Sequence, residues 1–230
     1  MFIVPAHVLK PDPVRADVVS RVISGGVALD DQEDVIQTDG GGRWNISWGE
    51  IDLDDIYSRQ LWDAWVAHFA GGAQSVLVPL LSLETAPRPI AGNGFAVPSD
   101  IVADDEWFPT SVGFASPHIV ATVGADAALR ATSIVIDVEQ GSQIQPGMKF
   151  GLGGNRAYKV ERVTARDGLT ATCRITPPLR AAIQEGDAVE FDWPVVECRA
   201  VVGQILSPDI SLGLFGTVSV SFVEHITYGD

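Results

Sequence analysis

The sequence predicts a mainly β protein with one long helix, in which strands from both ends of the chain share a sheet and a smaller β domain is inserted between them. Most of the 230-residue chain consists of short β-branched segments separated by turn-forming residues, a pattern typical of β-sandwiches and small barrels. Only residues 54–70 space their apolar side chains as a helix does. Residues 195–205 and 217–226 are predicted strands, and Val218, Val220 and Phe222 alternate with polar residues. We therefore expect these terminal strands to return to the sheet formed by the first 85 residues.

The first 53 residues predict two consecutive strand pairs. Residues 14–24 are rich in β-branched side chains, and Gly25-Gly26 supply a turn after them. Residues 35–38 and 43–53 form the second predicted pair, joined through Asp39-Gly40-Gly41-Gly42. An aromatic and apolar face is expected on the last of these strands, from Trp44, Ile46, Trp48 and Ile51.

The helix predicted at about 54–70 begins at Asp54-Asp55, where acidic side chains favour a helix start. We expect Leu61, Trp65 and Phe69 to pack on the sheet and Gly71-Gly72 to end the helix. A strand follows at residues 76–83, and Pro79 would place it at a sheet edge or at a bulge.

Residues 86–116 are predicted to form an extended arm or linker, because prolines and glycines leave no room for a long regular element. Trp107 and Phe108 lie in this arm, where no core surrounds them, and they are predicted to contact another subunit. Residues 84–116 are accordingly expected to lie on another chain or around the outside of a ring.

The inserted β domain is predicted at residues 117–192, and the sheet domain at 1–85 with 193–230. Asp167-Gly168 is a good hairpin turn, and a single helical turn is expected around residues 179–184. The strands expected in the insert are residues 119–123, 133–138, 148–152, 157–163, 169–176 and 187–191.

The charge of the chain excludes several classes of function. Thirty acidic and 15 basic residues leave a net charge of −15, which disfavours specific nucleic-acid binding. No apolar run approaches the roughly 20 residues of a membrane span, and the first residues lack an export signal. The two cysteines, Cys173 and Cys198, are too few for a disulfide scaffold, although a bridge between them stays open.

No catalytic, metal or cofactor site is predicted. The four histidines have no metal-ligand spacing, and no nucleophile elbow occurs. The acidic run from Asp30 to Asp34 lacks the alternation of a calcium loop. Gly151-Leu152-Gly153-Gly154-Asn155 has neither the third glycine nor the following helix of a phosphate cradle, which favours a β-turn. The sequence thus predicts a protein that is not an enzyme.

One segment carries a resemblance to a known family. Residues 147–194, GMKFGLGGNRAYKVERV followed by TCRITPPLRAAIQEGDAVEFDWP, resemble inserted β domains in tail proteins of long-tailed bacteriophages. The GRWNISW segment, the helix after it and the final VSVSFVEHI segment are similar to the split β-sandwich of distal tail or baseplate-hub proteins. The matching residues in the insert are Ile175, Pro177, Leu179, Arg180, Gly186, Asp187 and Val189.

This resemblance implies a structural virion protein, made in the host bacterial cytoplasm, that forms a ring of six copies at the tail tip. The ring would join the tail tube protein to a hub or fibre protein and leave a channel for DNA, without membrane insertion or a cofactor. Edges of the long terminal strands, with Val218, Val220 and Phe222, are expected to join the subunits. Acidic groups facing the channel would repel passing DNA.

Two alternatives stay open. The first is a carbohydrate-binding module for host-surface adhesion, in which an exposed ring such as Trp107 stacks on sugars. The second is a hydrolase with a carboxylate pair among Asp104, Asp105, Glu106 and the acids near Asp30.

Overall fold

The computed structural model describes residues 1–20, 22–27, 29, 31, 33–37, 41–88, 90–91, 94–95, 119–210 and 216–226. The chain is mainly β, as predicted, and it divides into two compact units. Unit 1 is Met1–Leu81 with Val195–Asp230, and unit 2 is Ser82–Pro194. The expected division at residues 85, 117 and 192 stays a prediction, because most of the 86–116 segment lies outside the described residues.

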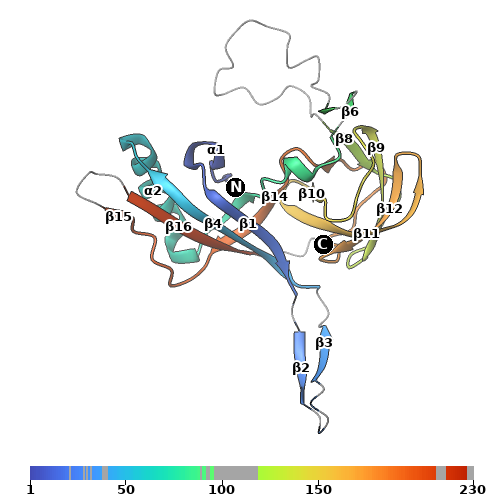
Figure 1. Ribbon diagram of the computed structural model, residues 1–230, viewed down its shortest axis with the longest axis horizontal. Coiled ribbons are helices and arrows are strands. Elements are labelled where there is room, and N and C mark those ends of the chain that lie inside the picture. Colours follow the sequence, from blue (N-terminus) through green and yellow to red (C-terminus); the bar gives the residue numbers. More distant parts are fainter. Residues whose placement is uncertain are drawn as a thin grey trace, which may run out of the picture. The chain divides into compact units, whose positions relative to one another are not determined.

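Unit 1 contains an antiparallel sheet that joins strands from both ends of the chain (Figure 1). Its order is β1-β4-β16-β14-β5, with β15 paired to β16. The strands are β1 (Asp12–Val19), β4 (Arg43–Leu53), β5 (Ser75–Pro79), β14 (Val195–Ala200), β15 (Asp209–Ile210) and β16 (Gly216–Glu224). The expected return of the terminal strands to the amino-terminal sheet is therefore present in the strand pairing.

One face of this sheet is apolar because its long strands alternate. In β4, Trp44, Ile46 and Trp48 are fully buried, whereas Asn45 and Asp52 between the apolar positions are exposed. Strand β16 pairs with β4 through a bulge between Val218 and Val220 and adds its own apolar side chains to the same core. The alternation expected from the sequence is thus confirmed for both strands.

Helix α2 (Ile56–Phe69) packs on β4 and is the one long helix of the described residues. Asp55 caps it, since its carboxylate accepts hydrogen bonds from the backbone N–H groups of Tyr57 and Ser58 at 2.6 and 2.8 Å. The buried helix face is formed by Ser58, Trp62 and Phe69. Of the three residues expected to pack on the sheet, Phe69 is buried, whereas Leu61 and Trp65 are only half-buried.

The expected pairing of the first strands is wrong. Residues 35–38 were predicted to pair with 43–53, but β3 (Glu33–Gln37) pairs with β2 (Val22–Val27), and β1 pairs with β4. The β2–β3 pair is a separate two-stranded sheet, and it lies between β1 and β4 in the chain (Figure 1). Gly25 and Gly26 lie at a register shift inside β2 and so do not turn the chain.

At the far side of the sheet, β5 is an outer strand, as Pro79 predicted, but it ends at Pro79 and is shorter than the expected strand at 76–83. Residues from the amino terminus lie beside it: the backbone N–H of Val4 donates to the carbonyl of Leu77, and the N–H of Leu77 donates to the carbonyl of Phe2, both at 2.9 Å. The short helix α1 (Ala6–Leu9) follows. These contacts cover one edge of β5, whereas β1 is the outer strand at the other side of the sheet and pairs with β4.

Unit 2 is a six-stranded, nearly closed antiparallel barrel in the order β13-β10-β11-β12-β9-β8. Backbone hydrogen bonds between Val123 and the Gly186-Asp187 segment bring β8 against β13 and nearly complete the circle. The strands are β8 (Val120–Val123), β9 (Ser133–Gln140), β10 (Lys149–Leu152), β11 (Arg156–Asp167), β12 (Thr170–Thr176) and β13 (Val189–Glu190). The short strands β6 (Ile90–Ala91) and β7 (Gly94–Phe95) precede them and pair with each other.

The barrel core is filled by alternate residues of its strands. Phe150, Tyr158 and Phe191 form a ring cluster, with centroids 5.7 Å apart in each of two contacts. The strands predicted in the insert are confirmed, and most of their ends lie within two or three residues of the predicted positions. The turn predicted at Asp167-Gly168 is also present, between β11 and β12. The helical turn expected at 179–184 is wrong, because Ile183 forms an isolated β-bridge with Ala127 and the segment is extended there.

Candidate assembly surfaces

The three strand residues expected to join subunits lie in the core of unit 1. Phe222 is fully buried, and its ring makes edge contacts with Trp48 and Phe69 at centroid distances of 5.7 and 5.6 Å. Val218 and Val220 are also buried on β16, which pairs on both sides. We therefore assign these side chains to core packing and correct the expected interface role. Alternation in a sequence identifies the apolar face but does not say what covers it.

The other two expected interface residues, Trp107 and Phe108, lie outside the described residues. The same holds for Asp30, for Asp104 to Glu106, and for most of the proline-rich arm. Their predicted roles stay predictions.

The β2–β3 hairpin of unit 1 has several exposed apolar side chains. Ile23 pairs with Ile36 across the ribbon, and both side chains are about 60% exposed, at 59% and 65%. Successive side chains of a strand point to opposite faces, so Val22 and Val35 lie on the opposite face from this pair. Exposure of these two valines is 53% and 54%. The hairpin thus has apolar side chains on both faces.

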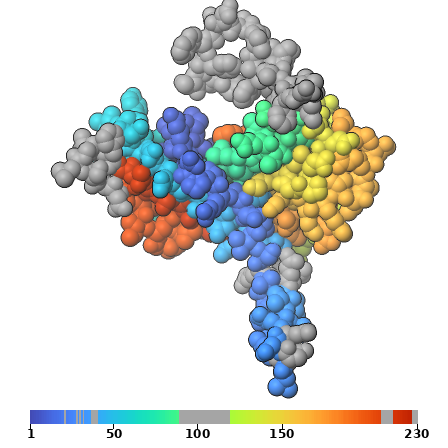
Figure 2. Space-filling model, viewed as in Figure 1, coloured from blue at the N-terminus to red at the C-terminus, as the bar shows by residue number. Residues whose placement is uncertain are grey.

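Figure 2 shows the hairpin as a narrow projection from the β1–β4 ribbon. The β1–β4 pair differs from the hairpin, because apolar side chains of β4 are buried in the sheet core. A two-stranded hairpin without other cover is at best marginally stable in water. Sequence reasoning recognised the strands here but missed their exposure, because Val and Ile in a strand usually predict a buried face.

In comparisons with known proteins, no family model matches the chain and no curated protein is significantly similar to it.

The residues that carry the resemblance have packing roles in the barrel. Ile175, Leu179 and Val189 are buried in its core. The backbone N–H of Arg180 donates to the hydroxyl of Tyr158 at 3.0 Å. Gly186, at a φ of 89°, donates its N–H to the carbonyl of Val123 where the barrel closes, and a side chain there would be strained. This set of residues therefore closes and fills the barrel.

The titratable side chains of the described residues include a histidine–carboxylate pair, His225 with Glu197. No group of three or more His, Cys, Asp or Glu side chains that could hold a metal ion is found among them. His225 Nδ1 lies 3.0 Å from Glu197 Oε1, and backbone bonding holds the pair, since the His225 N–H donates to the Glu197 carbonyl at 2.9 Å.

Both cysteines are free, and each is buried in a different unit. Burial raises the pKa of the Cys173 thiol from 9.0 to about 11. Burial also raises the pKa of Cys198, with a further contribution from the Glu224 and Glu197 carboxylates. Since the thiolate is the reactive form, both thiols are poor nucleophiles.

One small open pocket lies on unit 1, lined by Phe2, Ala64, Trp65 and His68. The ring of His68 contacts the rings of Phe2 and Trp65, each at 5.5 Å between centroids. The volume of the pocket, about 170 Å³, is below the roughly 300 Å³ at which small-molecule sites begin.

None of the helices in the described ranges has the length and apolar character needed to cross a membrane.

Proposed function

We propose that this chain is a structural virion protein that forms a ring, of six copies, at the distal end of a bacteriophage tail. In this proposal the ring joins the tail tube protein to a hub or fibre protein and leaves a channel for DNA. The observation that carries the proposal is the β2–β3 hairpin, whose apolar side chains are exposed on both faces. Exposed apolar surface of this kind is typical of a site of association.

A hairpin that projects from one part of a subunit contacts a different surface of its neighbour. Such a head-to-tail contact produces a closed ring when the rotation between neighbours closes. We place the ring at the distal end of the tail because residues 147–194 resemble inserted domains of tail proteins. A split β-sandwich for unit 1 is part of the same proposal. The main sheet formed by the described residues of unit 1, with α2 packed on its β4 strand, supports it.

The experiment is a mass measurement of the full chain by sedimentation or mass photometry over a range of concentrations. We expect a concentration-dependent closed oligomer, and we expect the double variant Ile23→Ser with Ile36→Ser to lower the associated fraction by at least tenfold. A loss of two buried apolar contacts accounts for a change of this size.

The matched control is Val202→Ser with Ile205→Ser, because these two side chains of unit 1 are also highly exposed, at 79% and 84%. The control is expected to leave the oligomer unchanged. A wild-type chain that stays monomeric at every concentration, or equal effects of the two double variants, would contradict the proposed hairpin-dependent ring.

A further inference from the structure

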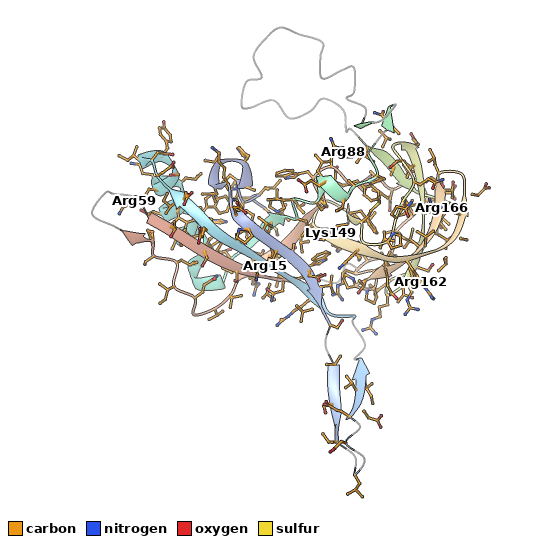
Figure 3. All side chains as sticks on the ribbon, in the orientation of Figure 1. Arg15, Arg59, Arg88, Lys149, Arg162 and Arg166 are labelled. Carbon is orange, nitrogen blue, oxygen red and sulfur yellow. The ribbon has the colours of Figure 1, made fainter. Side chains whose placement is uncertain are left out.

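The barrel has a cationic outer face in an acidic chain. Residues 149–176, which form β10, β11 and β12, contain six basic and two acidic residues, a net charge of +4 in a chain of −15. Figure 3 labels Lys149, Arg162 and Arg166 on these strands. The guanidinium of Arg166 donates to Gln143 Oε1 and to the Ile144 carbonyl, so it is part of the local structure.

Strand register places four of the other five basic side chains in like-charge pairs, whereas Arg156 lies opposite Leu152. Phe150 and Tyr158 are opposite one another and buried, so their neighbours Lys149 and Lys159, which are also directly opposite, lie on the outer face. Arg162 and Arg174 are opposite one another on β11 and β12, and both are exposed. Like charges directly opposite in a sheet are destabilising, and this arrangement repeats on two adjacent strand pairs.

Arg174 has an anionic partner within the face. Arg174 Nε lies 3.0 Å from Glu161 Oε2, and both side chains are about half exposed, at 48%. A single exposed pair of this kind contributes little to stability. The excess of basic groups on the face therefore favours binding of an anionic surface that brings several charges together.

The β2–β3 hairpin is complementary to this face in both charge and chemistry. Residues 22–37 contain four acidic residues and no basic residue, a net charge of −4. Asp31, Glu33 and Asp34 are exposed. The hairpin also has exposed isoleucine and valine side chains, which the aliphatic stems of lysine and arginine can cover.

We propose that the acidic hairpin of one copy docks on the cationic β10–β12 face of a second copy. This proposal rests on the proposed ring and names the two surfaces that meet in it. A nucleic acid fits the observations less well, because the −15 charge of the whole chain repels phosphate and because a polyanion would leave the apolar side chains of the hairpin uncovered.

Charge reversal on the full chain tests the contact. Arg162→Glu with Arg174→Glu is expected to weaken self-association roughly tenfold or more, and Asp31→Lys with Glu33→Lys is expected to do the same. An equimolar mixture of the two double variants restores association, because each supplies the surface that its partner needs. Association of the wild type falls as salt is raised.

Arg130→Glu with Arg199→Glu is the matched control, since it changes the charge equally at two exposed positions outside the face. Circular dichroism and thermal unfolding check that every variant folds. If Arg162→Glu with Arg174→Glu does not fold, Arg162→Gln with Arg174→Gln is measured in its place. Binding of a labelled DNA oligonucleotide to each variant is measured in parallel.

The outcomes separate this inference from the proposed ring. Loss of association in both reversals and recovery in the mixture support the contact. Oligomers that form normally in both reversals overturn the contact and leave the ring proposal standing. DNA binding that depends on Arg162 and Arg174 while association is unchanged also overturns it in favour of a nucleic-acid surface, and a chain that is monomeric throughout overturns both proposals.

Discussion

The barrel and the β2–β3 hairpin use similar residues in opposite ways. In the barrel, apolar residues of the strands, such as Phe150 and Ile136, are fully buried. In the hairpin, Ile23 and Ile36 are paired across two strands but remain more than half exposed. β-branched residues therefore form part of a self-contained core in one region and an uncovered ribbon in the other.

The difference between the two regions shows that closure of a sheet covers apolar side chains and pairs strand edges. Six strands that come back on themselves enclose a core and pair nearly all of their edges. A two-stranded ribbon has no interior, so its apolar side chains can be covered only by another surface. The hairpin is accordingly the region whose stability we expect to depend on association.

The largest expected effect is the loss of a buried ring from the barrel. Phe150→Ala is expected to lower the free energy of unfolding by about 3–5 kcal/mol, because it leaves a cavity beside Tyr158 and Phe191. Ile23→Ala in the hairpin is expected to change it by less than about 0.5 kcal/mol in the dissociated chain. Urea unfolding measures both, and similar losses at the two sites would remove the distinction between the regions.

Hydrogen exchange distinguishes the two regions without a mutation. In the dissociated chain, amides of β11 and β12 are expected to be strongly protected, since they lie in the middle of the barrel sheet. Amides of β2 and β3 are expected to exchange quickly and to become protected when the chain associates. Hairpin protection that is high and independent of concentration would show that the ribbon is stable alone.

The buried thiols give a smaller effect that depends on pH. Cys173 has a pKa raised from 9.0 to about 11 in the folded chain, so folding favours its protonated form. This contribution to stability is fully present below pH 9 and is lost as the pH rises toward about 11. Unfolding of the wild type and of Cys173→Ala between these values tests it, and the variant is expected to lose less stability with rising pH.

Thiol labelling provides the control for this prediction. With a thiol reagent near neutral pH, the folded chain is expected to react at neither cysteine, and the unfolded chain at both. Rapid labelling of the folded chain would mean that one of the two sites is accessible.

The smallest expected effect is at the start of α2. Hydrogen bonds from Ser58 and Tyr57 lower the pKa of Asp55 below 3.8, so its ionised form stabilises the fold above that pH and the contribution is lost as the pH falls through the folded value. Asp55→Ala is expected to lower the melting temperature slightly, and Asp55→Asn, which still caps, is expected to lower it less. Equal effects of both substitutions would mean that charge, and not capping, is the main contribution.

Local patterns in the chain were enough to predict the mainly β class, the extent of α2 and the Asp167-Gly168 turn, because each depends on neighbouring residues alone. Even the buried faces of β4 and β16 follow from their alternation. The exposed hairpin was missed for the same reason, since alternation and composition do not reveal whether a strand has a partner.

Three features depended on contacts between residues far apart in the sequence. Strand β1 pairs with β4 across the whole intervening hairpin, and no local signal distinguishes this from two separate hairpins. The buried face of α2 follows Trp62, whose indole donates to the Leu206 carbonyl at 2.8 Å, a residue distant in the chain. Lys149, Lys159, Arg162 and Arg174 share a face only through strand register. Short-range preferences therefore determine which segments become strands or helices, whereas pairing and register, which depend on the free energy of long-range packing, determine which side chains meet.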